Sequence, residues 1–259
     1  MAKAWAKFPY PDKKFHHTAA TLKKSWDRLH RGDAEPFPKS DAVIEAWIAF
    51  HAGDFQKAAE LGLKAGQEGV NVENKAQAIH ANYLEENEKR KLELFEEVAD
   101  RAEALQRSQP KNANAFYWQA YALGRYAQGI SIAKALAQGI GGKVKAALEA
   151  AIKLAPKHAD AHIALGAYHA EVIDKVGAMI GGLTYGAKKD AALKNYQAAL
   201  KLNPDSAIAR IEYANGLVML EGKKALKQAE ELYNEAAKCD PADAMEKLDV
   251  ELAKAELED

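Results

Sequence analysis

Histidines and carboxylates cluster in one stretch of the chain, and their spacing could hold a metal ion. The cluster comprises His158, Asp160, His162, His169 and Glu171. Residues four and seven apart share one face of a helix, so three imidazoles could point the same way. However, His158 follows Pro156 so closely that it should precede the helix, and buried histidines more often pack or cap than bind metal. We therefore expect packing or capping histidines and no metal site.

Other patterns that could support chemistry are weaker still. The run Gly139-Ile140-Gly141-Gly142-Lys143 could hold an anion at a helix start. It lacks the hydroxyl residue after the lysine and the preceding strand of a phosphate-binding loop, so a hinge is the better interpretation. The pairs Glu85-Glu86 and Glu96-Glu97 lie among basic residues, as on a solvated helix face. No nucleophile or metalloprotease motif occurs, so we expect no catalytic residues, no cofactor and no enzyme activity.

Composition narrows the class of protein further. The chain has 36 Lys and Arg against 37 Asp and Glu, which leaves no basic footprint for a nucleic-acid partner. Its one cysteine, Cys239, can form neither an intrachain disulfide nor a zinc cluster. No run of about 18 apolar residues occurs, so we expect no membrane partner and a cytoplasmic location. With 17 Gly and 8 Pro among abundant Ala, Leu, Lys and Glu, the chain should be mostly helical.

The two ends differ from the middle of the chain. Residues 1–14 contain three aromatic residues interrupted by Pro9 and Pro11, which predicts an extended aromatic arm. Helical spacing follows, so residues 1–39 should form the arm and a capping helix. The acidic residues 244–259 should form a second capping helix. We expect a helical repeat array between them, over residues 40–243.

Repeats support that array. One spacing recurs in four places. Two small or apolar residues lie four positions apart, and a proline follows the second of them by eight positions: Val98/Ala102/Pro110, Val144/Leu148/Pro156, Ala192/Tyr196/Pro204 and Ala229/Tyr233/Pro241. Residues 150–156 and 198–204 are also near copies. This shared register predicts a series of helix pairs, in each of which the proline ends the second helix.

On these residues the chain resembles the tetratricopeptide repeat family. The resemblance implies an all-α fold, a right-handed superhelical stack of helix hairpins whose first helices line a concave groove. The C-terminal half has long inserts between paired helices and the runs Leu165-Gly166-Ala167-Tyr168 and Gly182-Leu183-Thr184-Tyr185-Gly186. On these features it also resembles two tetratricopeptide relatives: the regulator of microtubule dynamics family and the T component of periplasmic tripartite transporters. None of these motifs is catalytic, so the resemblance favours a binding protein.

The repeat prolines are 46, 48 and 37 residues apart, against a family period of about 34. The extra residues precede two matching tripeptides, Ile140-Gly141-Gly142 and Ile180-Gly181-Gly182. We expect two prolonged hairpins, each a lengthened first helix with a glycine hinge at its tip. Because their side chains are largely apolar, the two should pack on each other within one chain.

The register places candidate partner-binding residues on the groove side of successive first helices. They are Trp118, Tyr121, Arg125, Gln128, Ile163, Ile211 and Asn215. The alternative, that Trp118 and Tyr121 are buried under neighbouring elements, stays open. We expect a non-enzymatic scaffold that binds a peptide or partner protein, as a monomer or weak homo-oligomer. The alternative function is a carrier of an apolar small molecule in a cavity walled by the prolonged hairpins.

Overall fold

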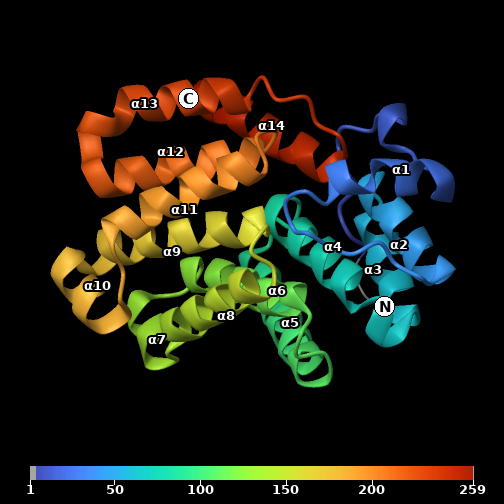
Figure 1. The fold of residues 1–259 in the computed structure, drawn as a ribbon, viewed down its shortest axis with the longest axis horizontal. Coiled ribbons are helices and arrows are strands. Elements are labelled where there is room, and N and C mark those ends of the chain that lie inside the picture. The colour runs from blue at the N-terminus through green and yellow to red at the C-terminus, as the bar shows by residue number, and fades with distance from the viewer. Residues whose placement is uncertain (1–3, 259) are drawn as a thin grey trace. The chain divides into compact units, whose positions relative to one another are not determined.

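The computed structural model describes residues 4–258, and every regular element in that range is helical (Figure 1). Helices α1 to α14 are joined by loops and by short 3-10 turns at Lys13–Phe15, Gly66–Glu68 and Gly222–Ala225. The all-α prediction is confirmed. The chain forms two compact units, one built from residues up to 30, 35–154 and 242–245, the other from 31–34, 155–241 and 246 onward.

The first unit contains the N-terminal helix pairs. Its helices are α1 (Ala19–Leu29), α2 (Asp41–His51), α3 (Phe55–Lys64), α4 (Val70–Tyr83), α5 (Glu88–Ser108), α6 (Ala113–Gln128), α7 (Ile132–Ala137) and α8 (Ile140–Leu154). Consecutive helices pack on one another: α2 on α3, α3 on α4, α4 on α5, α5 on α6, and α6 on α8. The repeat residues Val98 and Val144 lie in α5 and α8, so the sequence register pairs α4 with α5 and α6 with α8. Polar side chains cap several starts: Asp54, Asn87 and Asn112 each accept a hydrogen bond from a backbone N–H three residues on.

Helix α4 is the central element of this unit. It packs against α2, α3, α5 and α6, and residues 71–81 are all buried although many are polar. Arg101 of α5 satisfies part of this polar set: its guanidinium lies 3.0 Å from Oε1 of Glu73 and donates to Oδ1 of Asn74 at 2.7 Å. Burying a polar group without a hydrogen-bond partner is costly, so these bonds help to fix how α5 sits on α4.

From residue 4 on, the predicted aromatic arm lies extended over the tips of the first two helix pairs. Trp5 stacks on His80 with the ring centroids 4.4 Å apart, and its backbone N–H donates to Gln56. Phe8 lies against Phe55 and beside Gly53, whose φ is +89°. A Cβ at Gly53 would be 2.5 Å from the Phe8 ring, so both the turn and the arm require glycine there.

The second unit contains the C-terminal helix pairs. Its helices are α9 (Ala159–Val176), α10 (Ala178–Tyr185), α11 (Lys189–Leu202), α12 (Ala207–Glu221), α13 (Leu226–Ala236) and most of α14 (Ala244–Glu258). Helix α9 packs on both α11 and α12, and α12 packs on α13. Tyr196, the aromatic residue of the Ala192 repeat, is buried between Gly166 and Gly216, which shows why the repeat pairs a large residue with small ones.

The prolonged hairpins differ from the expectation in three ways. Helix α9 does extend to Val176, but α6 ends at Gln128 and α7 follows as a separate short helix. Both Ile-Gly-Gly tripeptides lie inside helices, α8 and α10. The chain turns at Gly139, with φ +64°, which lies within the run 139–143 interpreted as a hinge, and at Gly177, with φ +80°. The prediction of a hinge at each Ile-Gly-Gly tripeptide is wrong. Side chains expected to pack are also exposed: 48% for Ile132 and 78% for Met179.

Candidate partner-binding face

Four polar or aromatic side chains form a stripe along one side of α6. Asn114, Tyr121, Arg125 and Gln128 are spaced seven, four and three residues apart, which keeps them on one face of a helix. Trp118 is 3% exposed and buried beside Tyr121, with ring centroids 5.4 Å apart. Helix α6 therefore places the four side chains of the stripe on one face. Trp118 is buried under neighbouring elements, as the alternative interpretation of the sequence expected.

The accessible part of this stripe is its C-terminal end. The Arg125 guanidinium lies 5.4 Å from the ring centroid of half-buried Tyr121 and donates to Oε1 of Gln128 at 3.2 Å. A guanidinium held on an aromatic face keeps a fixed orientation and can donate several hydrogen bonds to a carboxylate. The arrangement suits recognition of an acidic group.

The expected residues of the second unit are packed more deeply. Ile163 lies in a core cluster with Ala199 and Ala209, and Ile211 lies in another between α12, α13 and α14. Their exposures of 6% and 2% make both of them packing positions, in contrast to the surface placement expected from the register. Asn215 is half-buried, and its Oδ1 accepts a hydrogen bond from the Tyr233 hydroxyl at 2.7 Å.

A carboxylate of the chain itself occupies the start of the α6 stripe. The Glu35 carboxylate accepts hydrogen bonds from Asn71 Nδ2 at 3.1 and 2.9 Å and from Asn114 Nδ2 at 2.5 Å. The Glu35 backbone carbonyl accepts from Nε1 of Trp26 at 2.7 Å. Sequence reasoning did not find this contact, although the two asparagines are both the second residue of their helices. We call Glu35, Asn71 and Asn114 the Glu35 clasp.

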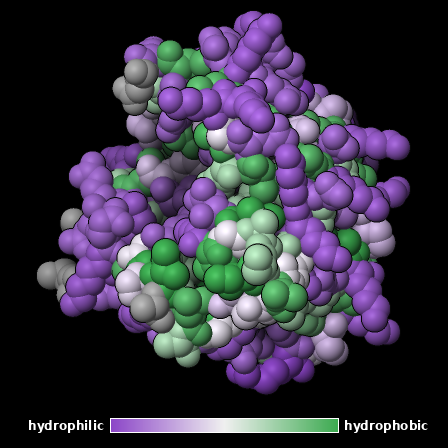
Figure 2. All heavy atoms as spheres, turned by 90° about the vertical axis from the view of Figure 1, so that its left-hand side faces the viewer, coloured by the Kyte–Doolittle hydropathy of each residue, from purple (hydrophilic) through white to green (hydrophobic). Residues whose placement is uncertain are grey.

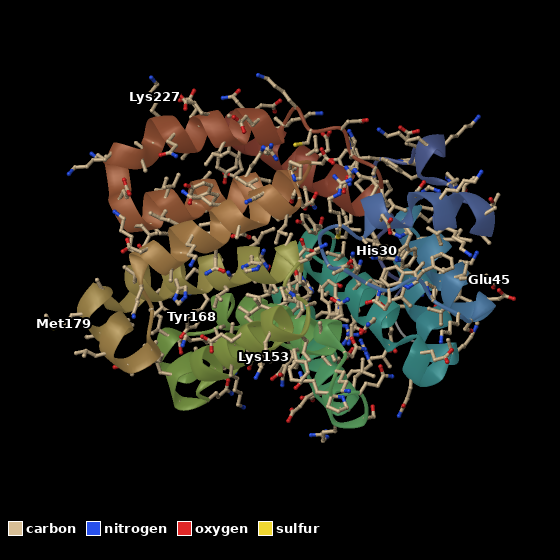
Figure 3. The ribbon with its side chains drawn as sticks, in the orientation of Figure 1. His30, Glu45, Lys153, Tyr168, Met179 and Lys227 are labelled. Atoms are coloured by element: carbon tan, nitrogen blue, oxygen red, sulfur yellow. The ribbon has the colours of Figure 1, made fainter. Side chains whose placement is uncertain are left out.

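A buried histidine pair is a second feature that the sequence did not reveal. The Nε2 atoms of His30 and His51 are 3.2 Å apart, and both rings are buried among Trp26 and Trp47. His30 is labelled in Figure 3. Burial and the nearby His51 lower the pKa of His17, whose ring lies edge-on to His51. This cluster belongs to the core of the first unit.

The histidines that the sequence singled out have structural partners. His158 caps α9, since its Nδ1 accepts from the Ala161 N–H at 3.1 Å, which confirms the capping interpretation. His162 Nδ1 lies 2.8 Å from Oδ1 of Asn195, and buried His169 lies edge-on to Tyr168. Within residues 4–258, no three or more His, Cys, Asp and Glu side chains are grouped to hold a metal ion.

A groove of about 350 Å³ lies between α5, α6 and α8 of the first unit. Its lining comprises Ala99, Asp100, Glu103, Gln106, Phe116, Gln119, Leu123, Lys143, Ala146 and Ala147. Charged and amide side chains make up half of these residues, and neither α7 nor α10 contributes. The groove is therefore lined by other helices than the prolonged hairpins, and it is more polar than the apolar cavity that a small-molecule carrier would need.

Among the described helices, none is both long and apolar enough to span a membrane. The family model described as "Regulator of microtubule dynamics protein 1-3" matches residues 54–258. A search of curated proteins found no match.

Two tetratricopeptide repeat proteins of known structure match this chain. TTC0263, a thermophilic protein of Thermus thermophilus, is 17% identical, with a TM-score of 0.58 over 83% of this chain and 98% of that one. YrrB, described as having an unusual peptide-binding site, is 16% identical, with a TM-score of 0.42 over 92% and 100%. The first likeness shows a tetratricopeptide-like fold, and the family match covers most of the sequence. The chain therefore belongs to the regulator of microtubule dynamics protein 1-3 family.

Proposed function

We propose that the protein is a non-enzymatic scaffold that binds an extended acidic segment of a partner protein on the accessible part of the α6 stripe. The main support for the proposal is the Glu35 clasp. There, Asn114 of the α6 stripe already binds a carboxylate, that of Glu35, from an irregular segment of the chain. As the sequence suggests, we take the protein to be cytoplasmic and a monomer or weak homo-oligomer.

The geometry of α6 supports a second acidic contact at Arg125. Arg125 follows Asn114 by 11 residues, which corresponds to roughly 16 Å along the helix. An extended peptide covers that distance with about five residues. A partner carboxylate at Arg125 would gain charge-assisted hydrogen bonds, while the ring of Tyr121 would support an apolar neighbour. Direct contact is proposed for Tyr121, Arg125 and Gln128. Asn215 stays a candidate in the second unit.

The test compares partner capture by matched charge-removing variants. Arg125→Ala removes the proposed carboxylate contact, and Lys153→Ala removes an exposed charge on α8 as the control. We expect a partner identified with the wild-type protein to bind Arg125→Ala at least about 10-fold more weakly and the control equally well. Binding should also weaken with added salt, because an exposed charge contact is screened. Equal binding by both variants would contradict the proposal.

A further inference from the structure

The short helix α10 presents apolar side chains that are largely exposed. Met179, Ile180 and Leu183 are 78%, 55% and 85% exposed. The helix packs on α9, and glycines with positive φ, Gly177 and Gly186, lie at its two ends. Met179 points outward from the unit (Figure 3), and hydrophobic side chains gather on this side of the molecule (Figure 2). Leaving so much apolar area in water is costly unless it has a partner.

The tip of the next hairpin belongs to the same unit and contacts the start of α11, the helix that follows α10. Lys189 at the start of α11 pairs with Glu221 at the end of α12, with 2.9 Å between the charged atoms. This second tip carries further exposed apolar side chains, Leu226 at 53% and Met219 at 37%. We call residues 174–190 and 218–228 together the hairpin-tip surface.

Lysines are frequent in the same two segments. The hairpin-tip surface contains six lysines against three carboxylates, although the whole chain has a net charge of -1. Four exposed lysines, Lys188, Lys223, Lys224 and Lys227, form no ion pair with any residue in the described range. Their charges are therefore available to an anionic partner.

We propose that the hairpin-tip surface docks on an anionic lipid bilayer. Exposed apolar side chains and exposed lysines in the same segments match the chemistry of an interfacial segment: the apolar groups enter the acyl boundary while the ammonium groups meet anionic headgroups. The protein as a whole is slightly acidic, but the hairpin-tip surface carries net positive charge. This surface is complementary to negatively charged lipid headgroups, and the proposal of an anionic bilayer as the partner rests on that complementarity. The sequence-based expectation of no membrane partner rested on the lack of a spanning segment, which peripheral docking does not need.

The experiment is co-sedimentation of the full chain with vesicles of phosphatidylcholine alone or with about 30% phosphatidylserine. The double variant Met179→Asp/Leu183→Asp removes the apolar contact, and Lys223→Glu/Lys224→Glu reverses the charge. Ile132→Asp/Leu136→Asp in α7 is the matched control, because it replaces exposed apolar residues outside the surface. Circular dichroism establishes that every variant is folded.

We expect the wild-type chain and the α7 control to bind the phosphatidylserine vesicles and both hairpin-tip variants to bind at least about 10-fold more weakly. Added salt should release the wild-type protein. The proposal is overturned if the wild-type chain fails to sediment or if the α7 control loses binding equally. A lower mass for Met179→Asp/Leu183→Asp in light scattering, without vesicle binding by the wild type, would identify a second copy as the occupant instead. These outcomes are independent of partner capture at Arg125.

Discussion

His51 at the end of α2 and Asp243 just before α14 face each other with Nδ1 and Oδ2 2.7 Å apart, although 192 residues separate them in the chain. Both side chains are buried. His51 also meets His30 through its other ring nitrogen, 3.2 Å away. This contact closes the first unit, because it fixes a late segment of the chain to the first repeat.

Removing the Asp243 carboxylate should show how much its contact with His51 contributes to stability. Asp243→Ala leaves a buried imidazole without its partner, so we expect the free energy of unfolding to fall by about 3 kcal/mol. Urea denaturation measures the change. The control is Asp27→Ala, which removes an exposed carboxylate on α1 and should cost no more than about 0.5 kcal/mol. Equal losses in the two variants would show that the buried contact contributes little.

Acid should destabilise the protein through His80. Burial lowers the pKa of His80 from 6.5 to about 4, and neither ring nitrogen has a hydrogen-bond partner among the described residues. Between these pH values the unfolded chain binds a proton that the folded chain does not, so stability falls as the pH drops from about 6.5 and levels off below about 4.

His80→Phe removes this proton linkage while keeping a ring to stack on Trp5. Between pH 7 and pH 4.5, we expect the wild-type free energy of unfolding to fall by about 2 to 3 kcal/mol more than that of the variant. Urea denaturation at the two pH values provides the comparison, with the exposed His16→Ala as control. A wild-type loss equal to that of His80→Phe would contradict the assignment.

Two glycine substitutions should have opposite signs. A Cβ at Gly216 would lie 2.5 Å from the hydroxyl of Tyr196, so Gly216→Ala should cost about 1 to 3 kcal/mol. Gly142 has nothing within 4 Å and an ordinary helical φ, so Gly142→Ala should gain about 0.5 kcal/mol from helix propensity. Thermal unfolding distinguishes the two. A stabilising Gly216→Ala would mean that Tyr196 can move aside.

The apolar residues of α7 should contribute little to stability. Ile132 and Leu136 are 48% and 45% exposed, so Ile132→Asp/Leu136→Asp should change the free energy of unfolding by no more than about 1 kcal/mol. Chemical denaturation tests this, and light scattering of the same samples reports oligomer mass. A large loss of stability in a monomer would instead support the packed hairpins expected from the sequence.

The sequence by itself determined the helical class, the repeat register and the family. These follow from local patterns: Ala192 and Tyr196 with Pro204 mark one second helix, and the same spacing marks the others. The register also placed Tyr121 and Arg125 on one face of α6, because helical periodicity fixes which residues share a side. The capping role of His158 was likewise readable from its place after Pro156.

Only the tertiary structure decided which of these residues are buried and which distant segments meet. Trp118 shares the face of Arg125 yet is covered, because burial depends on neighbouring elements and not on spacing. The same holds for the Glu35 clasp and for His51 with Asp243, whose partners are far apart in the chain. The turns lie at Gly139 and Gly177 instead of the Ile-Gly-Gly repeats, since every glycine permits a positive φ and packing selects the one that adopts it.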